Sequence, residues 1–182
     1  MFFVSDNHYF HRNIQKFCPD TRRGSDVFEM NELMIQAHNE RVGRNDVVFF
    51  LGDFSFGQAK ETKEVLLRLN GQKHFIIGNH DKVMISDASI REMFVTFQHY
   101  KETSWNKIKI CMFHFPMREW NHCHYGSIHL FGHVHGSLDD QPWGKSMDVG
   151  IDSRPSGDMA PWHIDEIIQK LKDRPDITHH GD

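Results

Sequence analysis

Histidine, aspartate and asparagine residues recur directly after short apolar runs of this sequence. They are Asp6, His8, Asp53, Asn79, His80, Asp81, His114, His133 and His135. Carboxylate, amide oxygen and imidazole are ligands of divalent metal ions, and imidazole is also a frequent acid–base catalyst. An isolated His-x-His pair is weak support for a site, but five such fragments in order along one chain are hard to produce by chance. The pattern therefore predicts a metal-dependent site.

The apolar runs that precede these residues have the length and composition of buried strands. We expect strands at residues 2–4, 47–51, 75–77, 94–100, 107–113, 127–131 and 146–149. Helices are expected after the capping pair Asp26 and Glu29, at about 60–69, and around 164–171. This order predicts one α/β domain, residues 1–182: a layered sandwich of mixed β-sheets flanked by helices. Ligands bind at the carboxyl ends of strands in such sheets, where the polar residues lie.

Composition excludes several classes of protein. The 182 residues carry a net charge of −4, which argues against an extended nucleic-acid surface or a polybasic membrane surface. No apolar run is long enough to span a membrane, and no secretory signal is visible, so we expect a cytoplasmic protein. The three cysteines lack CxxC spacing, which disfavours a thiolate zinc site or a disulfide framework. Of the fifteen histidines, only His179 and His180 look like tail material.

These five fragments, in their order along the chain, resemble the signature of the calcineurin-like metallophosphoesterase superfamily. That signature is D-x-H, G-D, G-N-H-D or G-N-H-E, H, and G-H-x-H, and each element is present between Asp6 and His135. Flanking segments resemble a small single-domain subgroup found in bacteria and phages, so the resemblance covers most of the chain. These segments are residues 5–14, Met30-Asn31, Phe115-Pro116-Met117 and Arg154-Pro155.

The resemblance implies a site for two divalent metal ions. The first would be held by Asp6, His8, Asp53 and His135, and the second by Asp53, Asn79, His114 and His133. Asp53 would bridge ions about 3.5–4 Å apart. Manganese is the first expectation, with iron, zinc, nickel or magnesium as alternatives. Two such ions against two carboxylates leave a charge of about +2, which suits a phosphate ester in spite of the acidic chain.

The resemblance also implies a mechanism. A metal-bridging hydroxide would attack the phosphorus directly, while Asn79 and the metals hold the phosphoryl oxygens. His80 would act as general acid for the leaving group. Asp81 would orient one of the inner residues. No covalent intermediate is required, and the cysteines receive no catalytic role.

Several other residues are weaker candidates for substrate contacts. His11 is expected to touch the substrate or brace His8. Arg118, Trp120 and His122 lie in a polar stretch that would be either a substrate loop, with Trp120 stacking on a base, or an ordinary surface loop. Arg22, Arg23 and Arg154 would be phosphate clamps or, more simply, surface arginines. His124 would likewise brace an inner residue or lie in the substrate loop. The histidines without site spacing are expected to be structural; they are His38, His74, His99, His129 and His163.

The substrate class stays open at this stage. Protein phosphatases extend G-D to G-D-x-x-D-R-G, whereas this chain reads Gly52-Asp53-Phe54-Ser55-Phe56-Gly57 and lacks the phosphate-binding arginine. The expected partner is a phosphodiester or phosphomonoester of a small molecule or nucleotide. A nuclease or nucleic-acid-end phosphatase is the alternative on the same site, and a catalytically silent metal-binding scaffold is a second one. The sequence does not indicate an oligomeric state.

Overall fold

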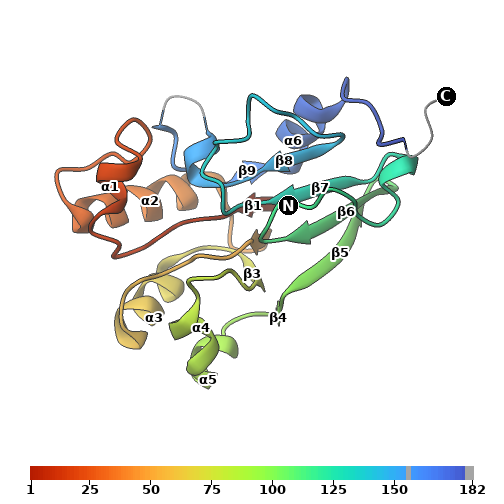
Figure 1. Ribbon diagram of the computed structural model, residues 1–182. Helices are drawn as coiled ribbons and strands as arrows, with labels where there is room; N and C mark the ends of the chain where they lie inside the picture. The colour runs from red at the N-terminus through yellow and green to blue at the C-terminus, as the bar shows by residue number, and fades with distance from the viewer. Residues whose placement is uncertain (155–156, 179–182) are drawn as a thin grey trace.

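Two β-sheets form the centre of the molecule (Figure 1). The computed structural model describes residues 1–154 and 157–178, so Pro155, His179 and His180 lie outside the described residues. The first sheet has the order β4-β3-β2-β1-β9 and the second β5-β6-β7-β8. The strands are β1 (Phe2–Val4), β2 (Val47–Phe50), β3 (Gln72–Ile76), β4 (Thr96–Gln98), β5 (Tyr100–Trp105), β6 (Ile108–Phe113), β7 (Ile128–Phe131), β8 (Ser146–Asp148) and β9 (Trp162–His163).

Both sheets are mixed, and each contains a parallel block. Strands β1 to β4 are parallel, with Val4 opposite Phe50 and Phe50 opposite Phe75, while β9 runs antiparallel to β1. In the second sheet β6, β7 and β8 are parallel and β5 is antiparallel to β6. A parallel bridge between Ser5 and Gly150 joins the ends of β1 and β8. The carboxyl ends of both parallel blocks therefore meet.

Side chains that alternate along the central strands divide the core into two layers. Phe2 and Val4 point into a cluster with the helices, whereas Phe3 points into a cluster between the sheets. These strands are buried on both faces, as in parallel sheets covered on both sides. The predicted fold class, a layered α/β sandwich with mixed sheets flanked by helices, is confirmed.

Helices α1 to α5 gather on the side of the first sheet away from the second (Figure 1). Their bounds are α1 (Ile14–Phe17), α2 (Val27–Arg41), α3 (Ala59–Arg68), α4 (Lys82–Ser86) and α5 (Ala88–Arg91), while α6 (Ile164–Leu171) packs into the intersheet cluster. Asp26 caps α2 as predicted, because its carboxylate accepts hydrogen bonds from Phe28 N and Glu29 N. Glu29 accepts from Ser25 rather than from Asp26. None of the helices in the described part of the chain is long and apolar enough to cross a membrane.

One predicted strand, residues 94–100, is wrong as a single element. Strand β4 ends at Gln98 in the first sheet and β5 begins at Tyr100 in the second, with His99 between them. The chain crosses from sheet to sheet at this point, which a continuous run of strand-forming residues does not reveal. The three cysteines are free thiols, as expected, and Cys111 and Cys123 are buried.

His38 on α2 is a structural histidine, and its burial makes stability depend on pH. It is 2% exposed, and its Nε2 donates to Asn70 O at 3.0 Å. Burial lowers the pKa of His38 to about 4, against about 6.5 in an unfolded chain. The unfolded chain therefore binds this proton more strongly than the folded chain. The contribution of neutral His38 to the free energy of unfolding is fully present above pH 6.5 and is lost as the pH drops towards 4.

We expect the free energy of unfolding to fall by about 2 kcal/mol more in the wild type than in His38→Gln between pH 7 and pH 5. Gln keeps an N–H donor for Asn70 but does not titrate. Urea denaturation at the two pH values measures the difference. Parallel losses in both proteins would show that His38 does not titrate in this window.

Candidate metal centre

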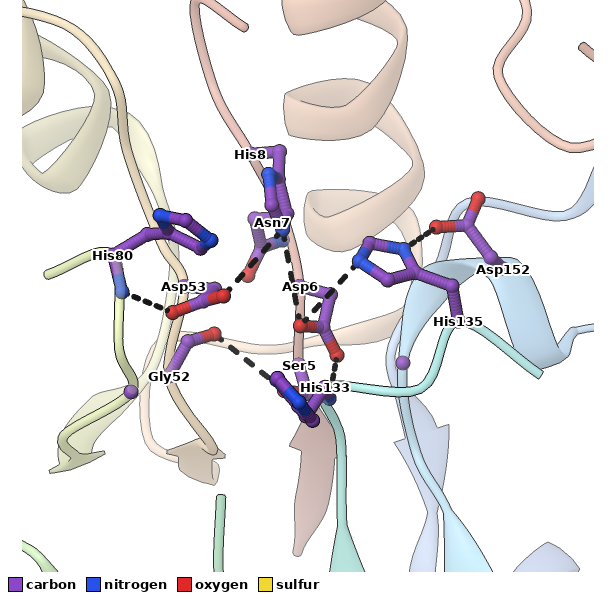
Figure 2. A network of polar contacts seen from close by, with 12 residues as sticks. Ser5, Asp6, Asn7, His8, Gly52, Asp53, His80, His133, His135 and Asp152 are labelled. Carbon is purple, nitrogen blue, oxygen red and sulfur yellow. Dashed lines mark hydrogen bonds and ion pairs between the residues drawn. The ribbon is translucent and has the colours of Figure 1, made fainter. Parts of the chain in front are cut away.

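The predicted metal-binding residues lie in loops directly after the strands, where both sheets bring their carboxyl ends together (Figure 2). Asp6 and His8 follow β1, and Asp53 follows β2. The other predicted ligands follow β3, β6 and β7; they are Asn79, His114, His133 and His135. His80, the predicted general acid, directly follows Asn79. The structure thus brings residues up to 129 positions apart, from Asp6 to His135, onto one face.

The backbone at these positions is held in an unusual conformation. Asp6, His8, Asp53, His133 and His135 all have positive φ, at 54°, 51°, 54°, 73° and 50° respectively. Each non-glycine residue in this left-handed region costs of order 1–3 kcal/mol, and such residues cluster at functional sites. The fold therefore directs these side chains inwards at a cost in stability.

Two glycines of the motifs permit the close approach of the loops. A Cβ at Gly132 would clash with Ser5 Oγ and with Asp6 Oδ2, and a Cβ at Gly78 would clash with Asp53 Oδ1. Any larger residue at either position would displace a predicted ligand. Glycine is therefore required at both positions, because the neighbouring loop leaves no room for a Cβ atom.

A first group of potential metal ligands consists of Asp6, His8 and His135. Asp6 Oδ2 accepts a hydrogen bond from His133 N at 2.8 Å, which leaves Oδ1 3.8 Å from His8 Nε2 and 4.0 Å from His135 Nε2 (Figure 2). These distances are too long for hydrogen bonds but fit ligands that each lie about 2.1 Å from a shared cation. Asp6 Oδ1 and both ring nitrogens of His8 are buried and have no hydrogen-bond partner among the described residues. A divalent cation would satisfy Asp6 Oδ1 and one nitrogen of His8.

A second group consists of Asp53, His114 and His133. Asp53 Oδ1 accepts from His80 N at 2.8 Å, and its Oδ2 lies 3.6 Å from His114 Nε2. The same Oδ2 lies 3.8 Å from His8 Nε2 of the first group (Figure 2). One oxygen therefore faces both groups, as a bridging ligand must.

The orientation of His114 also fits a cation. Its Nδ1 donates to Leu51 O at 2.7 Å, so in the neutral ring Nε2 carries a lone pair. That Nε2 lies 2.9 Å from Asn79 Oδ1 and faces Asp53 Oδ2 as well. With this ring neutral, three electron-pair donors would converge here, an arrangement that a cation stabilises.

Asp81 joins the loops that carry Asp53 and Asn79. Its carboxylate accepts from Asp53 N and Phe54 N, both at 2.9 Å, and from Gly78 N at 2.7 Å. Burial raises the pKa of Asp81 to about 6, against the effect of these three donors. These contacts support the predicted orienting role of Asp81 through the backbone of its neighbours.

Sequence reasoning missed a buried ion pair behind His135. Asp152 Oδ2 accepts from His135 Nδ1 at 2.6 Å, and Arg22 Nη2 donates to the same oxygen at 2.6 Å. Although burial opposes the effect, His135 and Arg22 hold the pKa of Asp152 well below its usual range. Asp152 follows β8 and comes two residues after Gly150, with Ile151 between them, so it lacks the adjacent glycine and aspartate that marked Asp53.

The expectation that Arg22 and Arg154 are surface arginines or phosphate clamps is wrong. Arg22 is 3% exposed, and its Nη1 donates to Asn7 O at 2.8 Å. Arg154 is 6% exposed, and its guanidinium lies 4.1 Å from the centre of the Trp162 ring. Both side chains stabilise the interior, while Arg23 is exposed.

The predicted substrate residues fall into different places. His11 lies at the site, with its ring 5.4 Å from that of His8. Trp120 is buried with Cys111 and Cys123, so it cannot stack on a base in this conformation. Arg118 covers the Trp143 ring at 4.7 Å, beside a separate pocket on the second sheet. His122 is exposed, with its ring 6.0 Å from that of Tyr125.

We expect the wild type to bind two Mn²⁺ ions per chain, and His135→Ala or His133→Ala to bind one, because each variant removes a ligand from one group only. The variant with both substitutions should lose both sites. Isothermal titration and elemental analysis count the ions, and His99→Ala, at an exposed position, is the matched control. Two tightly bound ions in the double variant would contradict the assignment.

We also expect Asp152→Asn to weaken Mn²⁺ affinity about 10- to 100-fold, since a carboxylate that orients a histidine ligand contributes this much. Asp173→Asn, an exposed position, is the control. Titration of Mn²⁺ into both variants tests this prediction. Equal affinities would show that Asp152 does not contribute to metal binding.

Comparison with known proteins shows similarity over almost the whole chain. No protein-family model matches. Uncharacterized protein MJ1445 of Methanocaldococcus jannaschii is 33% identical over 179 residues, which cover 94% of this chain and 91% of that protein. Gene 66 protein of Mycobacterium phage L5 is 26% identical and covers 83% of this chain and 86% of its own length.

A solved structure shares this fold. The protein of unknown function AQ665 from Aquifex aeolicus matches with a TM-score of 0.72 and 22% identity, over 94% of this chain and 98% of that one, so the two share a fold. A predicted phosphoesterase from Streptococcus pneumoniae TIGR4 matches at a TM-score of only 0.35, over 74% of this chain and 61% of that one, which supports no argument. On its extended sequence identity with MJ1445, the chain belongs to the family of that archaeal protein.

Proposed function

We propose that this protein is a metal-dependent phosphoesterase of the calcineurin-like superfamily, which hydrolyses a phosphodiester or phosphomonoester of a small molecule or nucleotide. The observation that carries the proposal is Asp53 Oδ2, which faces a histidine of each ligand group at 3.6 and 3.8 Å. A single carboxylate oxygen between two sets of ligands is the arrangement required for two neighbouring cations. Asp6 Oδ1 and the His8 nitrogens, which have no hydrogen-bond partner in the part of the chain that the structure describes, give independent support.

The residues divide into two ligand sets with Asp53 in common. One ion would be held by Asp6, His8, Asp53 and His135, and the other by Asp53, Asn79, His114 and His133. Oxygen and imidazole donors without thiolate favour manganese, with iron, zinc, nickel or magnesium as alternatives. When bound, such a pair supplies Lewis acidity and lowers the pKa of water.

His80 is the residue best placed to donate a proton to the leaving group. Its backbone N donates to Asp53 Oδ1 at 2.8 Å, which fixes the loop, while its side chain is exposed. The ring centre lies 6.0 Å from that of His8. The imidazole can therefore reach an oxygen that departs from the site without being a ligand itself.

Asn79 contributes a polar side chain on the same loop. Its Oδ1 faces His114, and its position is exposed, so a phosphoryl oxygen can approach it. The catalytic set in this proposal is therefore His80, Asp53 and Asn79. No specific contact among residues 1–154 and 157–178 favours a nuclease or a non-catalytic scaffold over this proposal.

We expect Mn²⁺-loaded protein to hydrolyse bis(p-nitrophenyl) phosphate or p-nitrophenyl phosphate, and Asp53→Asn to reduce turnover about 100-fold or more. The folded state of the variant is checked by circular dichroism, and His99→Ala serves as the control. A matrix of metals and substrates identifies the preferred pair. Wild-type turnover by Asp53→Asn would refute the two-metal proposal.

His80→Ala should retain its metals but lose about 100-fold in rate on an ester with an alkoxide leaving group. The loss should be small on a nitrophenyl ester, because nitrophenolate leaves without a proton. Rates on the two substrates, normalised to metal content, provide the test. Equal losses on both would mean that His80 is not the general acid.

A further inference from the structure

A pocket of about 250 Å³ lies beside His80, and the ring of Phe56 forms part of its wall. Its lining residues are Ser55, Phe56, Gly57, His80, Lys82 and Val83. Phe56 is 42% exposed, although phenylalanine is among the residues most often buried. A single exposed apolar side chain needs no explanation in general, so its surroundings decide whether it has a role.

Three histidines of the site surround Phe56. Its ring stacks on His11 with centres 4.2 Å apart and an interplanar angle of 15°, and on His8 at 5.1 Å and 20°. The His80 ring centre lies 5.2 Å away. Phe56 thus contacts a predicted metal ligand and the predicted general acid at once. Phe28, 55% exposed on α2, has no ring contact with a histidine among the described residues.

The backbone that carries Phe56 is firmly held. Phe56 N donates to Tyr9 O at 2.8 Å, and Tyr9 forms a parallel bridge with Ser55. Ser55 Oγ shares a hydrogen bond of 2.8 Å with Thr62 Oγ1, which ties the loop to α3. These contacts hold the backbone, and the stacked His11 ring holds the Phe56 side chain. A ligand that stacks on Phe56 therefore loses little entropy in ordering the protein.

We infer that this pocket receives the leaving group of the substrate and that Phe56 selects leaving groups with a planar aromatic ring, such as an aryl or nucleoside alcohol. The inference rests on the proposed function, because the proton donor His80 lies where the leaving oxygen departs, and His80 also lines the pocket. Aromatic pairs contribute about 0.5–1.5 kcal/mol beyond the area they bury. A planar ring should therefore bind roughly 2- to 12-fold more tightly than a saturated ring of similar size.

The test compares 2-phenylethylphosphonate with 2-cyclohexylethylphosphonate by isothermal titration calorimetry on the Mn²⁺-loaded protein. Both are inert analogues of phosphate esters, and they differ in planarity at similar size, with the cyclohexyl ring the more hydrophobic of the two. We expect the wild type to prefer the phenyl compound within that range, Phe56→Ala to lose the preference, and Phe56→Tyr to retain it. Phe28→Ala is the matched control and should behave as the wild type.

Equal binding of the two phosphonates by the wild type, or a preference that survives in Phe56→Ala, would overturn the inference. The corresponding esters, benzyl phosphate and cyclohexylmethyl phosphate, separate the two claims, since both release a primary alkoxide. Hydrolysis of both at equal efficiency would retain the proposed function and reject the selectivity of Phe56. Binding with the predicted preference, but without hydrolysis of these monoesters or of bis(p-nitrophenyl) phosphate under any metal, would retain the pocket and reject the enzyme.

Discussion

The candidate site depends on the contacts of the Asp53 carboxylate. This carboxylate lies at the end of β2, in the middle of the first sheet, and one of its oxygens is fixed by His80 N at 2.8 Å. The other oxygen faces His8 from β1 and His114 from β6, so it connects ligand groups carried by the two sheets. Movement of either sheet relative to the other would separate these atoms. The intersheet core is therefore part of the site's geometry.

Asp6 repeats this division between its two oxygens. One oxygen accepts from His133 N, and the other is buried without a partner among the described residues. An unsatisfied buried polar atom costs about 1–3 kcal/mol, and the five left-handed backbone positions add to that cost. The fold thus carries local strain at one edge of an otherwise well-packed structure. Cations that bind the folded state would recover part of this energy.

Much of the fold and the candidate site could be predicted from the sequence, because both depend on local patterns. Apolar runs that end in glycine and aspartate or histidine marked the strand ends, and the glycines are required by close contacts such as that of Gly132 with Asp6. The division of residues 94–100 between two sheets was not predictable, since it depends on the direction in which the chain continues after Gln98. Nor was the burial of Arg22, whose partner Asp152 is 130 positions away. Trp120 shows the opposite error: an aromatic residue in a polar stretch is buried by the fold.

The central claim is that Asp53 is shared by two cations, and anomalous diffraction from Mn²⁺-soaked crystals at the manganese edge tests it most directly. The account predicts two anomalous peaks about 3.5–4 Å apart, both within bonding distance of Asp53 Oδ2. One peak would lie near Asp6, His8 and His135, and the other near Asn79, His114 and His133. A single peak, or two peaks that do not share Asp53, would contradict the account.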